Sequence, residues 1–128
     1  MYGPTTLIAD VPGASIQIGE ATRLNGAVIH AQANVSIGRR VLMAAQSTIL
    51  DSNGHVVYPP ESRGTERDVP RPVVVEDDVW IGMGAVVLPR SHIGEGSIIG
   101  ANTVVSGRIP AHSILRAESS IAPLERRG

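Results

Sequence analysis

The feature of this sequence that most restricts its fold is a six-residue period of aliphatic residues. In the segment VWIGMGAVVLPRSHIGEGSIIG, which runs from Val79 to Gly100, the dipeptide Ile-Gly occurs at positions 81, 93 and 99. Counting in sixes from residue 75 gives an aliphatic side chain at every step: Val75, Ile81, Val87, Ile93, Ile99 and Val105. An earlier part of the chain keeps the same period, with one extra residue near His30: Ile18 and Leu24, then Ile37, Met43 and Ile49. Neither the 3.6-residue period of a helix nor the two-residue alternation of a strand produces this pattern.

A six-residue period is typical of short strands separated by tight corners. The aliphatic residue points inward, a glycine or small residue allows the bend, and three sides complete a coil of about eighteen residues. Successive coils stack as parallel strands about 4.8 Å apart. We therefore predict an all-β fold, a triangular parallel β-helix of about four coils, covering residues 18–36, 37–54, 75–92 and 93–110.

One long loop interrupts the period. Between residues 49 and 75 a single repeat step is expected, but about twenty further residues are present. The segment DSNGHVVYPPESRGTERDVPRP is rich in proline, glycine and charge and has no periodicity, so we predict a loop excursion at about 51–72. Loops of this length in compact domains are usually functional or disordered.

Length and composition limit the remaining possibilities. A chain of 128 residues suits a single domain over 1–128, with an irregular first coil up to Ser15 and a C-terminal tail at about 111–128 that covers the last coil. The net charge of -1 gives no reason to expect nucleic acid, and the absence of cysteine excludes disulfides and a cysteine nucleophile. No apolar stretch reaches the ~18 to 20 residues of a membrane span. We expect a cytoplasmic protein.

Among the four histidines, His55 is the candidate for chemistry. It follows the turn-forming DSNG at the start of the long loop, whereas the other three, His30, His92 and His112, fall within the coils. The alternative for any lone histidine is a structural or solvated role. Asp51 either orients the imidazole of His55 through its second ring N–H or serves only as a turn residue at the end of a strand, and we favour the turn.

Three segments, ILDSNGHVVYPPESRG, RPVVVEDDVWIGMGAVVLP and IGEGSIIGANTVVSGRIP, resemble the hexapeptide-repeat acyltransferases. That family folds as a left-handed parallel β-helix. The closest resemblance is to its sugar O-acetyltransferase branch, which includes galactoside, maltose and capsular-polysaccharide enzymes, and it covers roughly residues 16–115. The resemblance implies acetyl-CoA as the acyl donor, no metal, a sugar or polysaccharide acceptor, and a homotrimer with active sites between neighbouring subunits.

The resemblance also implies roles for individual residues. His55 corresponds to the catalytic base that accepts the proton of the sugar hydroxyl as it attacks the thioester, and the backbone N–H of Met83 to the donor that stabilises the oxyanion. The acceptor site is expected to include Asn25, Trp80 and Arg63, although Trp80 has an equal claim to be a subunit contact. The CoA site is expected to include Gly82, Ala101, Arg108 and Arg116, with the two arginines in place of the lysines that relatives carry in their tail motif.

We therefore predict an acetyl-CoA-dependent O-acetyltransferase that acts on a sugar hydroxyl of a surface polysaccharide or its precursor. The polysaccharide is favoured because the chain starts almost at its first coil, without the N-terminal helical segment of the galactoside and maltose enzymes. The alternative is a catalytically silent β-helix that serves as a scaffold or binding subunit, which the altered tail supports. A zinc enzyme of the γ-type carbonic anhydrase kind needs two histidines a few residues apart, which this chain lacks. A nucleotidyltransferase would need a separate nucleotide-binding domain.

Overall fold

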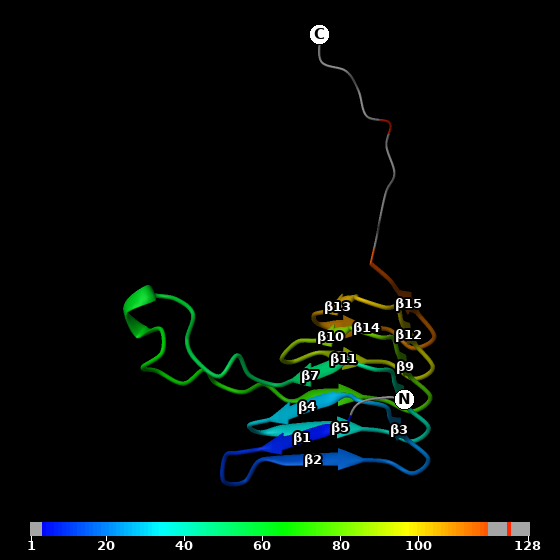
Figure 1. The fold of residues 1–128 in the computed structure, drawn as a ribbon, viewed down its shortest axis with the longest axis horizontal. Helices are drawn as coiled ribbons and strands as arrows, with labels where there is room; N and C mark the ends of the chain where they lie inside the picture. The colour runs from blue at the N-terminus through cyan, green and yellow to red at the C-terminus, as the bar shows by residue number, and fades with distance from the viewer. Residues whose placement is uncertain (1–3, 118–122, 124–128) are drawn as a thin grey trace.

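The computed structural model describes residues 4–117 and 123. The strands form a triangular prism of three parallel five-stranded sheets (Figure 1). Sheet A contains β1 (Thr6–Ala9), β4 (Val28–Ala31), β7 (Thr48–Leu50), β10 (Val86–Val87) and β13 (Val104–Val105). Sheet B contains β2 (Ser15–Ile18), β5 (Asn34–Ile37), β8 (Val73–Val75), β11 (His92–Ile93) and β14 (Arg108–Ile109). Sheet C contains β3 (Arg23–Leu24), β6 (Leu42–Met43), β9 (Trp80–Ile81), β12 (Ile98–Ile99) and β15 (Ile114–Leu115). Each coil passes through sheets A, B and C in turn, so the predicted all-β parallel β-helix is confirmed.

The periodic aliphatic residues form the core of the prism. All six residues of the main series, from Val75 to Val105, are at most 1% exposed. The position four residues later in each repeat also points inward and is buried in five of its six occurrences: Val79, Ala85, Ser91, Ser97 and Thr103. Identical positions of successive coils lie directly above one another, as with Ile81 and Ile99 in sheet C. The interior is therefore a set of aliphatic ladders whose burial is the main favourable contribution to stability.

The glycine of the Ile-Gly repeat allows the coils to stack closely at the corners. A Cβ atom placed on Gly94 would lie 2.4 Å from the backbone nitrogen of Ala111 in the next coil, and one on Gly82 would lie 2.7 Å from that of Ala101. Both distances are far shorter than carbon and nitrogen atoms tolerate, so these corners accept only glycine.

The predicted number of coils is wrong, because each sheet has five strands and the prism has five coils. The first coil, β1 to β3, is complete and pairs in register with the second. The last coil ends with β15, inside the segment that we expected to be tail. A strict period misses both ends because the corners differ in length: Thr6 pairs with Val28, twenty-two residues on, whereas Ile98 pairs with Ile114, only sixteen residues on. The end of the tail, which was expected to cover the last coil, lies outside the described residues apart from Pro123.

The loop excursion is confirmed. It connects β7 of sheet A to β8 of sheet B. Its length is seen in the pairing of Leu42 with Trp80 in the next coil, which lies thirty-eight residues on, twenty more than one regular coil requires. We call residues 51–72 the arm. It projects away from the prism and carries the 3-10 helix η1 (Pro60–Ser62) near its tip (Figure 1). In the part of the chain that the structure describes, no helix has the length and apolar character needed to cross a membrane.

Candidate functional site

His55 lies near the base of the arm, on its outgoing limb. Its backbone forms an antiparallel β-bridge with Arg67 on the returning limb, and its side chain is exposed. The two limbs are joined by backbone hydrogen bonds on both sides of this bridge, from the Val56 N–H to the Glu66 carbonyl (2.9 Å) and from the Asp68 N–H to the Gly54 carbonyl (3.3 Å). The arm thus holds the imidazole outside the aliphatic core, where a substrate can reach it.

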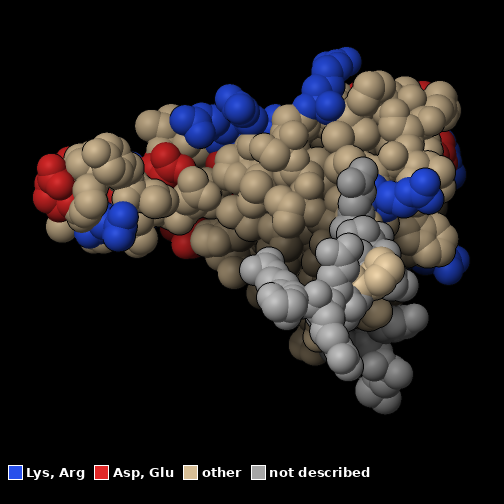
Figure 2. Space-filling view, turned by 90° about the horizontal axis from the view of Figure 1, so that it is seen from above, with Lys and Arg blue, Asp and Glu red and all other residues tan. Residues whose placement is uncertain are grey.

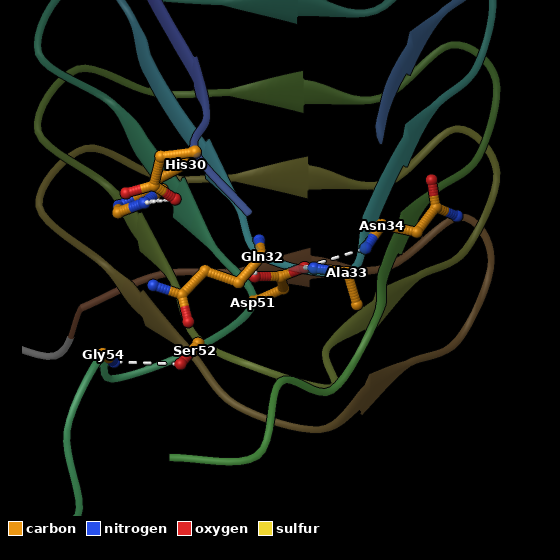
Figure 3. A network of polar contacts seen from close by, with 8 residues as sticks. His30, Gln32, Ala33, Asn34, Asp51, Ser52 and Gly54 are labelled. Carbon is orange, nitrogen blue, oxygen red and sulfur yellow. Dashed lines mark hydrogen bonds and ion pairs between the residues drawn. The ribbon is translucent and has the colours of Figure 1, made fainter. Parts of the chain in front are cut away.

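Asp51 anchors the base of the arm to the prism. Its side chain is fully buried, and its carboxylate accepts three backbone hydrogen bonds from the corner between β4 and β5, at 2.8 Å from Gln32, 2.8 Å from Ala33 and 2.9 Å from Asn34 (Figure 3). Its own carbonyl accepts the N–H of Arg71, where the arm returns, at 2.7 Å. Both carboxylate oxygens are therefore engaged with the backbone, and among the described residues Asp51 makes no hydrogen bond to His55. The carboxylate thus neither contacts His55 nor caps its own turn; it joins the start of the arm to a corner 17 to 19 residues earlier in the chain.

Most of the residues expected at the CoA site lie along one edge of the prism, the corners between sheets C and A. Gly82 and Met83 belong to one coil, Ala101 to the next and Arg116 to the last. Stacking is direct, since the Met83 carbonyl accepts the Asn102 N–H at 2.8 Å and a Cβ on Gly100 would lie 3.1 Å from the Cβ of Arg116. The Met83 N–H has no hydrogen-bond acceptor among the described residues.

The predicted acceptor residues are divided between this edge, its neighbouring face and the arm. Asn25 lies on the same edge, in the first coil. Trp80 is 53% exposed on the outer face of sheet C, in an apolar row with Leu42, Ile98 and Ile114. Arg63 donates from Nε and Nη2 to the Val57 carbonyl at 3.0 and 2.9 Å, within the arm.

The remaining CoA residue, Arg108, lies on sheet B beside His92 rather than on the edge between sheets C and A. The outer side of sheet B also carries an ion pair between His92 and Glu76, whose hydrogen bond holds the pKa of the Glu76 carboxyl below its usual range.

A single chain does not bring His55 and Met83 together. Met83 lies at the corner where the chain enters sheet A, and the arm leaves from the corner at the opposite end of the strands of that sheet. No group of three histidine, aspartate or glutamate side chains suited to a metal ion occurs in residues 4–117.

Sequence reasoning missed a pocket at the base of the arm. It has a volume of about 320 Å³ and is lined by Val11, Gln32, Arg67, Asp68, Val69 and Pro70. The sequence carried no signal for it, because the pairing of His55 with Arg67 depends on the register of a loop that has no periodicity.

Comparison with known proteins places this architecture among transferases. The family described as bacterial transferase hexapeptide (six repeats) matches residues 72–107. The chain is 36% identical over 92 residues to the putative lipopolysaccharide biosynthesis O-acetyl transferase WbbJ of Escherichia coli, covering 64% of this chain and 45% of that protein. It is 34% identical over 103 residues to the galactoside O-acetyltransferase of Escherichia coli, covering 80% of this chain and 50% of that protein. The chain thus spans half or less of the length of these curated relatives.

The fold agrees with these sequence matches. The hexapeptide-repeat acetyltransferase VCA0836 of Vibrio cholerae, solved in complex with acetyl coenzyme A, superposes with a TM-score of 0.75 at 27% identity, covering 88% of this chain and 66% of that one. Period, sheet topology and sequence similarity agree, and the chain belongs to the hexapeptide-repeat transferase family.

Proposed function

We propose that the protein is an acetyl-CoA-dependent O-acetyltransferase that acts on a sugar hydroxyl of a surface polysaccharide or its precursor. The observation that carries this proposal is the arm, which holds an exposed histidine at the base of a hairpin-like excursion from a hexapeptide prism. The relatives named above support the reaction, because they are named O-acetyltransferases and a similar acetyltransferase has been solved with acetyl-CoA. The polysaccharide acceptor is supported by the lipopolysaccharide role in the name of WbbJ.

In the proposed reaction, the imidazole of His55 accepts the proton of a sugar hydroxyl while the hydroxyl oxygen attacks the thioester carbonyl carbon. A histidine is suited to this step at neutral pH because its ordinary pKa is near 6.5. The Met83 N–H, which has no acceptor among the described residues, is available to donate to the oxyanion. When the tetrahedral intermediate collapses, the C–S bond breaks and the imidazolium returns its proton to the CoA thiolate.

The edge between sheets C and A is the proposed place of CoA. Gly82 is buried and lets the next coil pack closely, Ala101 is exposed at the stacked corner, and the exposed guanidinium of Arg116 is suited to a CoA phosphate. Arg108 lies on another face, so its role in CoA binding stays a prediction without support from this geometry.

We also propose a homotrimer, because His55 and Met83 lie at different corners of one chain and a working site needs both. A second chain placed against the exposed row of Trp80, Ile98 and Ile114 would bury that apolar surface. Light scattering should give three times the 13.4 kDa of one chain, and Trp80→Glu should shift the protein towards monomer. A stable wild-type monomer would remove the composite site. A cytoplasmic location stays a prediction.

The catalytic role is tested with His55→Ala against His112→Ala as the matched control. His112 lies in a corner between β14 and β15, far along the chain from the arm. We expect His55→Ala to lower kcat by about 10²- to 10⁴-fold, the usual contribution of a general base, with CoA affinity unchanged and no covalent acetyl-enzyme in either protein. Wild-type kcat in His55→Ala would contradict the assignment.

Acetyl-CoA itself distinguishes the enzyme from a silent scaffold. A ligand that binds only the folded protein raises the melting temperature, so acetyl-CoA at about 100 times its Kd should stabilise the protein by about 2.7 kcal/mol. No shift at millimolar acetyl-CoA would favour the scaffold.

A further inference from the structure

We propose that the pocket at the base of the arm binds an anionic group of the acceptor, so that the acceptor is an acidic sugar. This inference rests on the proposed function and adds the substrate class, a hexose that carries a carboxylate or a phosphate. Arg67 would bind the anion while His55, its partner across the arm, faces a hydroxyl of the same or the neighbouring ring.

The first support is the geometry of the His55–Arg67 pair. The backbone hydrogen bonds described above flank the pair instead of joining it, which is the arrangement in which opposite residues approach most closely. Directly opposite residues of an antiparallel pair also project to the same face. The imidazole and the guanidinium are therefore expected on the same face of the arm, where Arg67 lines the pocket.

The second support is that the guanidinium of Arg67 has no ion-pair partner among the described residues. The two carboxylates near Arg67 each accept a hydrogen bond from another residue, and Asp10 in addition interacts with Arg67 electrostatically, without an ion-pair contact. Asp10 is bound by His30 at 3.1 Å, and this hydrogen bond is the main reason that the pKa of the Asp10 carboxyl is lowered. Asp68 accepts the Asn53 N–H at 3.3 Å. Arg67 is thus an exposed cation at the pocket to which an anionic ligand can bind, with the planar geometry that suits carboxylate and phosphate.

The rest of the pocket suits a sugar ring. Val11, Val69 and Pro70 supply an apolar wall for the C–H face of a pyranose. The side-chain amide of Gln32 is free to bind hydroxyls, because Asp51 uses only the backbone N–H of this residue. Figure 3 shows the amide extending from the corner between β4 and β5 towards Ser52, near the start of the arm.

A basic edge continues from the pocket along the prism. Arg71 and Arg90 lie in the same column of corners, since the Arg90 N–H donates to the Arg71 carbonyl at 3.0 Å, and both side chains are exposed. Figure 2 shows basic side chains along the edge of the prism next to the arm, and acidic side chains on the arm itself. The exposed guanidinium groups of Arg67, Arg71 and Arg90 along this edge favour an acceptor with repeated negative charges over a neutral glycan.

The test measures sugar binding directly, without turnover. The 128-residue chain is titrated by calorimetry at one ionic strength with trigalacturonic acid, glucose 1-phosphate and neutral maltotriose. We expect at least one acidic sugar to bind about tenfold or more tightly than maltotriose, and Arg67→Gln to weaken that binding by roughly 10- to 100-fold, as expected when a charge-assisted hydrogen bond is lost. Preference for the first probe identifies a uronic-type carboxylate, and preference for the second identifies a sugar phosphate.

Arg39→Gln is the matched control, because Arg39 is exposed at a corner between sheets B and C and only its backbone N–H and carbonyl are hydrogen-bonded. It should leave affinity unchanged. If Arg67→Gln does not fold by circular dichroism, Arg67→Lys replaces it and should give intermediate affinity, since the charge is kept and the planar fork is lost.

Two results would overturn the inference. One is equal affinity for acidic and neutral sugars, even if acetyl transfer by His55 is confirmed. The other is a DNA oligonucleotide of matched charge that binds as tightly as the acidic sugars and is weakened equally by Arg67→Gln, since the surface would then be a general polyanion site. If acetyl-CoA fails to bind while the Arg67-dependent preference for acidic sugars persists, the acid-binding pocket stands and only the acetyltransferase assignment fails.

Discussion

Replacing Asp51 by alanine should destabilise the prism more than any other single carboxylate removal at the arm. The buried carboxylate satisfies three backbone N–H groups of the corner between β4 and β5 at 2.8 to 2.9 Å. It does so at the point where the arm leaves the coil, so the same residue supports the stacking of two coils and the position of His55.

The size of the effect follows from these three bonds. A buried donor left without a partner costs about 1–3 kcal/mol. Because Gln32, Ala33 and Asn34 are only half-buried, water can reach part of the space, and we expect a loss of about 3–5 kcal/mol for Asp51→Ala. That is a large share of the ~5–15 kcal/mol of a typical domain. With an unfolding entropy of about 2.1 cal/mol/K per residue, it corresponds to a fall in melting temperature of about 10–20 °C. Asp51→Asn keeps one acceptor oxygen and should lose about 1–3 kcal/mol.

The assay is denaturant unfolding followed by circular dichroism at one protein concentration, because any subunit association makes stability depend on concentration. Asp68→Asn is the matched control in the arm, since its carboxylate accepts one hydrogen bond of 3.3 Å, and it should cost less than about 1 kcal/mol. A loss below about 1 kcal/mol in Asp51→Ala would show that water replaces the carboxylate, and the anchoring role of Asp51 would be refuted.

Three further predictions concern the corners, the pH dependence and the arm. Gly94→Ala should destabilise the protein by several kcal/mol, as expected for overpacking against rigid backbone, because the new Cβ would lie 2.4 Å from the Ala111 nitrogen. Unchanged thermal unfolding would show that the coils separate easily. The pKa of Glu76 is lowered chiefly by the hydrogen bond from His92. The contribution of the ionised Glu76 to stability is therefore present above the ordinary glutamate pKa of about 4.3 and is lost as the pH falls below that value. Glu76→Gln should flatten this part of the curve of stability against pH, and a curve identical to that of the wild type would contradict the pairing. Amides at 55–67 should exchange faster than those of the prism and slow on binding of acetyl-CoA and acceptor, whereas equal protection in the free protein would argue against a mobile arm.

The core and the arm were predictable because both depend on local patterns. An inward aliphatic residue every six positions is required for each side of the prism, and every residue of the main series from Val75 to Val105 is buried. The arm was visible as a break in that period, and its limits at about 51–72 agree with the end of β7 and the start of β8. The role of Asp51 was not predicted, because its carboxylate bonds a corner 17 to 19 residues earlier instead of its own turn.

The number of coils and the composition of the site were not predictable in the same way. The corners at both ends of the prism depart from the six-residue step, so β1 and β15 could be found only from strand pairing. Arg67 was not predicted as a site residue. Its partner, His55, lies twelve residues away in an irregular hairpin, and no periodicity in the sequence fixes the register of that hairpin. Arg108 lies on sheet B and Arg116 at the corner that follows sheet C, so the two arginines that were expected to bind CoA together are separated.

The sequence by itself determined the parallel β-helix, its aliphatic interior and the histidine-bearing arm, because each depends on which residue types recur at which spacing, and a one-dimensional repeat stacks each coil only on its neighbours. Only the tertiary structure decided that Met83, Ala101 and Arg116 share one edge, that Trp80 lies in an exposed apolar row, and that His55 meets Arg67 at a pocket. These relations depend on the lengths of irregular corners and on backbone hydrogen bonds between distant segments, and no local spacing encodes them.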